Sequence, residues 1–291
     1  MAGRYLLLFL GVFACSTSAI QTKLSETHPV VLAALRLLIA GLLLSPIFLL
    51  ELKKHRETFT RLHLRRIVIP SAVLAVHLIS WSYGARLALA AQSSLIVNLV
   101  PAAMPFFLNA LLGEKINRRE ILGTTVAIAG VLVLTLRDAL SGGDIIGNVV
   151  CFGSMLLFAW YLALGRKNRD FPSLWLYVVP VYALAGTICL IASLPWIGTF
   201  KIHSTREWSL MFGLACIPTI LGHSLLNAAM RHLRGQIVGL CNVGQFVFAG
   251  FLAFFIFGEV PPPTFYAASL LVVAGIGIVV FSAPTPPPRM R

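Results

Sequence analysis

Long apolar runs with few charges dominate this chain and constrain its fold more than any other feature. A helix that crosses the hydrocarbon core of a bilayer needs about 20 apolar residues. The sequence offers ten such runs, at 4–22, 29–50, 67–86, 90–113, 120–137, 145–165, 171–197, 208–230, 235–258 and 261–283. Only 11% of the residues are charged, against about 25% in a soluble domain. We therefore predict an all-α membrane protein with ten transmembrane helices and no soluble domain.

The first run has a competing interpretation as a signal peptide, because Arg4 precedes an apolar stretch with small residues at Ala14 and Ala19. The 18 uncharged residues from Tyr5 to Thr22 are long enough to span a bilayer, and nine more runs follow. We predict that this run is retained as the first helix.

The cysteines predict neither a disulfide framework nor a metal site. All five lie in apolar runs, and no two form a CxxC pair. An odd number of thiols within lipid favours packing roles. We expect no cofactor and no bound metal.

Basic residues set the orientation. Of the 23 Lys and Arg residues, 17 fall at the N-terminus, in the even-numbered loops and in the tail, and 5 fall in the odd-numbered loops. Cytoplasmic loops carry such an excess of basic residues, so both termini are predicted to be cytoplasmic. The net charge of +13 then reflects topology and contact with the lipid bilayer, and no nucleic-acid partner is expected. The proline-rich residues 284–291 predict a disordered C-terminal tail.

Two halves of the chain share matching positions at equivalent boundaries of the runs. Gly113 and Glu114 match Gly258 and Glu259, Gly130 matches Gly275, and Gln92 and Asn98 match Gln236 and Asn242. We interpret residues 1–140 and 141–283 as two copies of a five-helix repeat.

Because five is an odd number of crossings, the second repeat must enter the membrane from the opposite face. The loops agree with this inversion. Basic residues at 115, 118 and 119 follow the first Gly-Glu pair, whereas prolines at 261–263 follow the second. Inverted repeats are typical of secondary transporters, whose substrate site lies between the halves near the middle of the membrane.

Several short segments resemble the EamA-type branch of the drug/metabolite transporter superfamily. They are Ser16–Ile20 with Lys23, Leu35–Ala40, Tyr83–Ala85, and Pro101 through Gly113-Glu114-Lys115. The resemblance covers almost the whole chain and implies an exporter of amino acids or other small metabolites in a bacterial inner membrane. Where the family often has Trp early in the first span, this chain has Cys15.

Polar and aromatic residues within the runs are the candidates for substrate contact, because polar groups at lipid depth usually face the interior. His77 and Trp81 are spaced i, i+4, as are His223 and Asn227, so each pair shares a helix face. The predicted substrate-binding residues are His77, Trp81, Tyr83, Asn98, Trp160, Tyr161, His223, Asn227, Asn242 and Gln245.

Each candidate also has a structural interpretation. A buried Asn or Gln can simply bond a neighbouring helix, and Tyr83 can belong to an interfacial aromatic belt. His77 and His223 are in addition candidate proton carriers, because imidazole titrates near neutral pH.

Arg36 lies about seven residues into the second run. It is either an anchor for an anion or carboxylate, or a structural residue that snorkels or pairs with carbonyls or a loop acid. The structural interpretation is preferred at this point.

All ten Asp and Glu residues fall in loops or at the ends of runs. Antiport driven by a mid-span carboxylate therefore lacks its key residue, and a neutral or zwitterionic small-molecule substrate fits better than an organic cation. We predict a secondary transporter that exports amino acids or related compounds by alternating access. Transport of another solute, such as an organic cation or a sugar derivative, is the alternative in either direction.

Two other classes of function compete with transport. An intramembrane lipid-modifying enzyme would need a catalytic cluster such as HExxH or GxSxG, and the sequence has neither. A structural or signalling subunit would need no polar pocket. The sequence does not decide between a monomer and a homodimer.

Overall fold

The computed structural model describes residues 2–87, 96–97, 99–139, 145–199, 204–258 and 263–282. All regular secondary structure in these ranges is helical. The elements are α1 (Ala2–Leu24), α2 (Pro29–Lys54), α3 (Arg61–Arg66), α4 (Val68–Leu87), α6 (Val100–Leu112), α7 (Arg118–Ala139), α8 (Ile145–Lys167), α9 (Leu174–Ser193), η1 (Leu194–Thr199), α10 (Thr205–Leu214), η2 (Ala215–His223), α11 (Ser224–His232), α12 (Gly235–Asn242), α13 (Gln245–Phe257) and α14 (Pro263–Ser282).

Within the described ranges, eight helical segments are long and apolar enough to cross a membrane, and Val100–Leu112 is a shorter apolar helix. The predicted runs at 90–113 and 120–137 are not among the eight. The all-helical, multi-pass prediction is confirmed, and the number of ten crossings stays a prediction.

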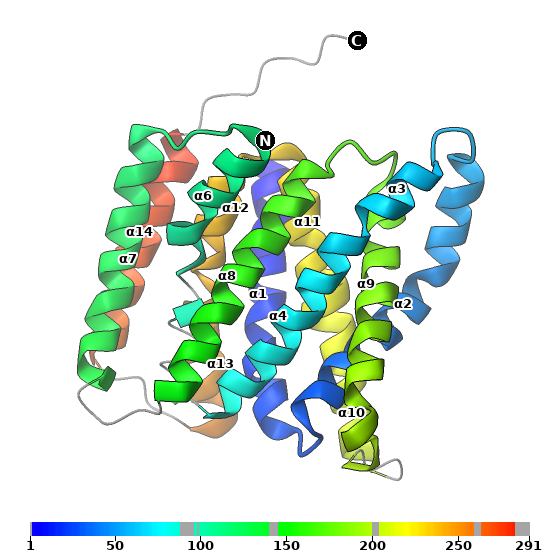
Figure 1. The fold of residues 1–291 in the computed structure, drawn as a ribbon. Coiled ribbons are helices and arrows are strands. Elements are labelled where there is room, and N and C mark those ends of the chain that lie inside the picture. Colours follow the sequence, from blue (N-terminus) through cyan, green and yellow to red (C-terminus); the bar gives the residue numbers. More distant parts are fainter. Residues whose placement is uncertain are drawn as a thin grey trace.

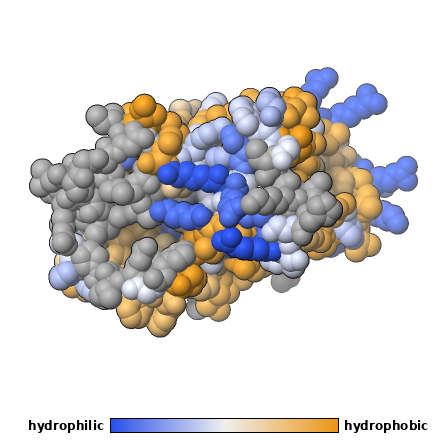
Figure 2. Space-filling model, turned by 90° about the horizontal axis from the view of Figure 1, so that it is seen from below, coloured by the Kyte–Doolittle hydropathy of each residue, from blue (hydrophilic) through white to orange (hydrophobic). Residues whose placement is uncertain are grey.

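The outer surface is strongly apolar. Leu42, Phe106 and Phe281 are 73%, 77% and 92% exposed. Helices satisfy their own backbone hydrogen bonds, so such surfaces are stable in lipid. Seen from below, hydrophilic residues gather at the centre of the face, and hydrophobic residues lie along its upper and lower edges (Figure 2). Further hydrophilic side chains project at the right end of this view. This distribution is that of a protein whose sides contact the hydrocarbon and whose ends meet water.

The long helices pack in pairs that join distant parts of the chain (Figure 1). α7 packs against α14 at one end of the molecule, and α2 packs against α9 at the other. Between these pairs, α4 packs against α8, and α1 packs against η2 and α11. In Figure 1, α1 runs downward and α8 runs upward, and the first residues of α1 and the last of α14 lie on the same side.

Two close helix approaches share the same geometry. A Cβ added to Gly84 in α4 would lie 2.5 Å from the Sγ and 3.1 Å from the backbone N of Cys151 in α8. A Cβ added to Gly222 in η2 would lie at the same two distances from the Sγ and N of Cys15 in α1. Each crossing therefore depends on a glycine that faces a small side chain.

Two matching 13-residue helices, α6 and α13, end on glycines in the left-handed conformation. The φ angles are 64° at Gly113 and 67° at Gly258. This conformation strains residues that carry a Cβ, so glycine terminates both helices at positions 145 residues apart.

Ion pairs cross between distant segments on the face where α1 begins. Arg166 donates to Glu114 over 3.2 Å, and Arg234 donates to Glu120. Arg66 pairs with Asp170 over 2.6 Å, and this hydrogen bond lowers the pKa of the Asp170 carboxyl. The loops of this face are thereby tied together across the molecule.

The predicted run at 208–230 is continuous from Thr205 to His232, but its middle is a π-helix, η2. Pro218 lies inside η2 and has no N–H to donate. The wider π turn accommodates such a residue, and π segments are frequent at functional sites. The run at 235–258 is likewise interrupted, since a turn at Val243 and Gly244 separates α12 from α13.

Candidate functional site

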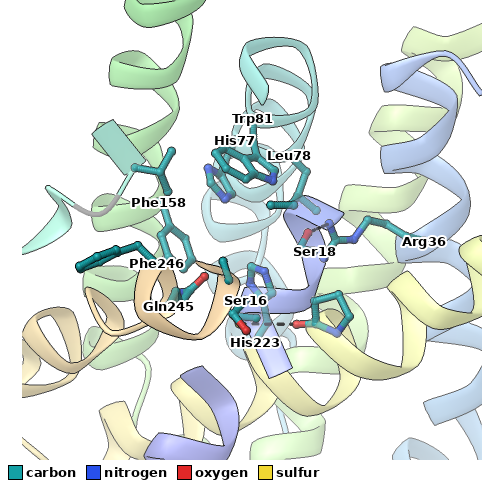
Figure 3. Close-up of a pocket in the computed structure, with 15 residues that line it drawn as sticks. Ser16, Ser18, Arg36, His77, Leu78, Trp81, Phe158, His223, Gln245 and Phe246 are labelled. Carbon is teal, nitrogen blue, oxygen red and sulfur yellow. Dashed lines mark hydrogen bonds between the residues drawn. The ribbon is translucent and has the colours of Figure 1, made fainter. Parts of the chain in front are cut away.

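A pocket opens among α1, α2, α4, α8, η2 and α13, with Val97 also in its lining (Figure 3). It holds about 560 Å³ of space not occupied by atoms, including the solvent at its mouth. Its lining residues are Cys15, Ser16, Ser18, Ala19, Arg36, His77, Leu78, Trp81, Val97, Phe158, Pro218, His223, Gln245, Phe246 and Ala249. The lining residues of α1 and α4 lie in the second halves of these helices.

His77 forms one wall and is fixed by α8. Its Nδ1 lies 3.0 Å from the carbonyl oxygen of Ser154, and its ring stacks on Phe158 with centroids 4.7 Å apart. The Ser154 hydroxyl oxygen also lies 2.9 Å from Nδ1, and which atom donates depends on the tautomer. In the neutral tautomer that carries its hydrogen on Nδ1, that hydrogen satisfies the carbonyl oxygen and Nε2 is a hydrogen-bond acceptor.

His223 lies across the pocket from His77, beside the buried polar side chains of Tyr161 and Asn227. Its ring centroid is 5.6 Å from that of Phe158 and 5.9 Å from that of Tyr161. Asn227 donates to the Tyr161 hydroxyl and to the His223 carbonyl oxygen, both over 2.8 Å. The Nδ1 of His223 has no hydrogen-bond partner among the described residues.

Arg36 reaches from α2 to the pocket and is 1% exposed. Its Nε donates to Thr219 Oγ1 over 3.0 Å, and its Nη1 donates to Ser18 Oγ over 3.2 Å. Figure 3 shows the guanidinium directed at Ser18. The buried Nη2 has no partner among the described residues.

The predicted site residues divide into three groups. His77, Trp81, His223 and Gln245 line the pocket. Tyr161, Asn227 and Asn242 are buried beside it, and Asn242 accepts a hydrogen bond from Gln245. Tyr83 and Trp160 do not line it, and Asn98 lies outside the described residues.

Tyr83 and Trp160, which do not line the pocket, contact other residues. The Tyr83 hydroxyl lies 3.1 Å from Nε2 of His28, at the turn between α1 and α2. His28 in turn stacks on Trp196. The Trp160 ring stacks near Phe107, with centroids 6.2 Å apart.

The structure adds lining residues that the sequence predictions passed over. Phe158, Phe246 and Leu78 supply apolar walls, and Pro218 supplies part of the π-helical wall. Nothing in the sequence separates these residues from the other apolar residues of the runs. Arg36 had a signal, because an arginine within a membrane span is by default a functional candidate.

The chemistry of the lining is neutral to positive. Among its described members there is one permanent cation, Arg36, and no Asp or Glu. No group of His, Cys, Asp or Glu in the described chain could hold a metal ion. The arrangement suits binding through hydrogen bonds, aromatic contact and one guanidinium.

Comparison with known proteins relates this chain to transporters. The sequence matches the EamA-like transporter family twice, over residues 3–136 and 145–281. It is 25% identical over 188 residues to an uncharacterized transporter of Archaeoglobus fulgidus, which covers 64% of this chain and 65% of that protein. The alignment thus spans slightly less than two thirds of the archaeal protein.

A crystal structure of another protein superposes on this chain with a TM-score of 0.78. The match covers 96% of each chain at 17% sequence identity. At this identity the likeness concerns the fold alone.

Proposed function

This chain belongs to the EamA-like transporter family, and from that premise we propose that it exports amino acids or related small metabolites by alternating access. The proposed location is the inner membrane, with both termini in the cytoplasm. The 17-to-5 division of basic residues supports this orientation. So does the arrangement in Figure 1, where α1 begins and α14 ends on one side.

The observation that carries the proposal is the pocket between the two family-matched segments. The first segment contributes α1, α2 and α4, and the second contributes α8, η2 and α13. A solute bound there would contact both segments at once. A rocking motion between them would then change the side from which the solute is accessible.

Several contacts support two inverted five-helix repeats within residues 1–140 and 141–283. A two-fold relation would exchange α1 with α8 and α4 with η2, and the matching Gly–Cys contacts at Gly84 and Gly222 agree with it. The same relation would exchange α2 with α9 and α7 with α14, and the two helices of each pair pack against each other. The breaks before α6 and α13 fall near the pocket, as discontinuous helices do in transporters.

Ion pairs on one face of the protein suggest which stage of the transport cycle this conformation represents. On the face where α1 begins, Glu114 with Arg166 and Glu120 with Arg234 link the two segments. The pocket residues of α1 and α4 lie toward the opposite face. We assign this conformation to an outward-facing stage, in which the cytoplasmic ion pairs hold the inner side closed.

His77 and His223 remain our candidate proton carriers, because no carboxylate lines the described part of the pocket. For the same reason an organic cation is a weaker candidate substrate, since it would depend on aromatic contact alone.

A first experiment measures flux in proteoliposomes that contain the purified protein and a panel of amino acids. Trp81→Leu should lower the rate of the transported amino acid about tenfold or more, because it removes an aromatic wall of the pocket. Trp175→Leu is the matched control, because Trp175 packs against the core from α9 and does not line the pocket.

Flux that falls equally in both variants would show a loss of folding and not of binding. Saturable flux of none of the tested amino acids would refute the substrate class. Full activity of a folded Trp81→Leu variant would refute the pocket as the site.

A further inference from the structure

The guanidinium of Arg36 uses only part of its hydrogen-bonding capacity. An arginine side chain has five N–H donors. The described partners are two hydroxyl oxygens, Thr219 Oγ1 and Ser18 Oγ, and the buried Nη2 has none. Arg36 is the largest fully buried residue in the described part of the chain.

The structural interpretations of Arg36 do not match this geometry. A snorkelling arginine places its head in water, but Arg36 is 1% exposed. The hydrogen bonds given above go to side-chain hydroxyls and not to backbone carbonyls, and no ion pair joins Arg36 to a described carboxylate. The charge is therefore held without the partner that a buried guanidinium normally has.

The surrounding structure orients the group toward the pocket. The Thr219 hydroxyl donates to the Leu214 carbonyl oxygen over 2.8 Å, so its lone pairs remain to accept from Arg36. The Thr219 carbonyl in turn accepts a hydrogen bond from the Tyr182 hydroxyl. Thr219 lies in η2, directly after Pro218, so the π turn holds the residue that positions Arg36.

We propose that Arg36 binds the carboxylate of the transported solute, so that the substrate class is a carboxylic acid or a zwitterion. This inference rests on the proposed function. A carboxylate would supply two acceptor oxygens in the planar geometry that guanidinium matches. It would also compensate the buried charge.

The other walls fit the remainder of an amino acid. In the tautomer with its hydrogen on Nδ1, His77 has Nε2 as an acceptor. Gln245 keeps its carboxamide oxygen as an acceptor because its Nε2 donates to Asn242. Both residues line the pocket and can accept from an ammonium group. Trp81 and Phe246 supply apolar surface for a side chain.

The test compares ligands that lack either the carboxylate or the amino group. Purified protein is titrated calorimetrically with each of the common amino acids, and each amino acid that binds is compared with its primary amide and with its deaminated acid. The native protein should bind the acid forms at least about tenfold more tightly than the amide, because a hydrogen-bonded charge pair is lost in the amide.

The variants test the residue. Arg36→Gln should reduce the preference for acid over amide to within about twofold, and Arg36→Lys should leave an intermediate preference because it keeps the charge and loses the planar fork. Arg86→Lys is the matched control, since Arg86 donates to the carbonyls of Ser25 and Thr27 and does not line the pocket. It should leave the preference unchanged.

Equal weakening of acid and amide binding in Arg36→Gln would overturn the inference and make the residue structural. If Arg36→Gln does not fold, an unchanged preference in Arg36→Lys would overturn it as well. Saturable flux of neutral or cationic solutes, together with no calorimetric binding of any ligand that carries a carboxylate, would refute the inference. The proposed transport function would then still stand. Absence of flux for any solute would refute the proposed function itself.

Discussion

Glu120→Ala is expected to lower the free energy of unfolding by about 3 kcal/mol, because it removes one partner of a buried ion pair and one half of a helix cap. The Glu120 side chain is 2% exposed and accepts from Arg234, whereas the Arg234 side chain is 33% exposed. Solvent around Arg234 limits the penalty to the lower end of the range for buried pairs.

The helix cap adds to this effect. Asn117 precedes α7, and its Oδ1 accepts from the Glu120 backbone N over 2.9 Å. The Glu120 carboxylate accepts from the Asn117 backbone N, also over 2.9 Å. This reciprocal pair is a capping box that satisfies two donors at the start of α7.

Chemical denaturation of the detergent-solubilised protein measures the loss. Glu57→Ala is the control, because Glu57 is exposed in a loop and should change stability by less than about 0.5 kcal/mol. Arg234→Met should cost much less in the Glu120→Ala background than in the native chain. A loss below about 1 kcal/mol, with additive effects of the two substitutions, would contradict the role assigned to the pair.

Gly275→Ala is expected to destabilise the contact between α7 and α14 by about 1–3 kcal/mol, the range for an overpacked site. The added Cβ would lie 2.5 Å from the Gly123 carbonyl oxygen and 2.9 Å from the Ala127 backbone N. Both atoms belong to the backbone of α7, so no side-chain rotation can relieve the clash.

Thermal unfolding of the purified protein checks this prediction. Gly153→Ala in α8 is the matched control, because a Cβ there meets nothing within 4 Å and alanine favours a helix. The control should keep or raise the melting temperature, and Gly275→Ala should lower it by several degrees. Equal melting temperatures for the two variants would show that the helices do not approach as closely as described.

Much of the fold could be predicted because lipid makes the sequence pattern explicit. Helices in a bilayer must be long, apolar and internally hydrogen-bonded, so the apolar runs predicted the long helices of the described ranges. The short helix α3 (Arg61–Arg66) falls between two predicted runs, where we expected a loop. The π-helical middle of the run at 208–230 could not be predicted, since Pro218 alone does not distinguish a kink from a π turn. The break between α12 and α13 has no strong sequence signal either.

The candidate site was predicted only in part, because polarity marks burial and not the direction of a side chain. His77, Trp81, His223 and Gln245 line the pocket. Tyr83 carries the same signal but lies against His28. Apolar lining residues such as Phe158 carry no signal, because the same types of residue cover the lipid-facing surface.

The two histidines illustrate how register limits such predictions. They fall at roughly corresponding places in the two halves of the sequence. The matched glycines Gly84 and Gly222 are 138 positions apart, and this offset relates His77 to Ala215 and not to His223. The histidines nevertheless meet in one pocket, where both rings contact Phe158.

Accessibility of the pocket from the two sides of the membrane tests the proposed transport cycle most directly. Ala249→Cys, in a chain whose five native cysteines are replaced by alanine, places a thiol on the pocket lining. The protein is reconstituted in sealed vesicles and treated with a membrane-impermeant maleimide from one side or from the other.

Alternating access predicts that the thiol at position 249 reacts from both sides and that a saturating transported amino acid slows both reactions. Reaction from one side only, at a rate that no solute alters, would contradict a shared central pocket between two moving halves.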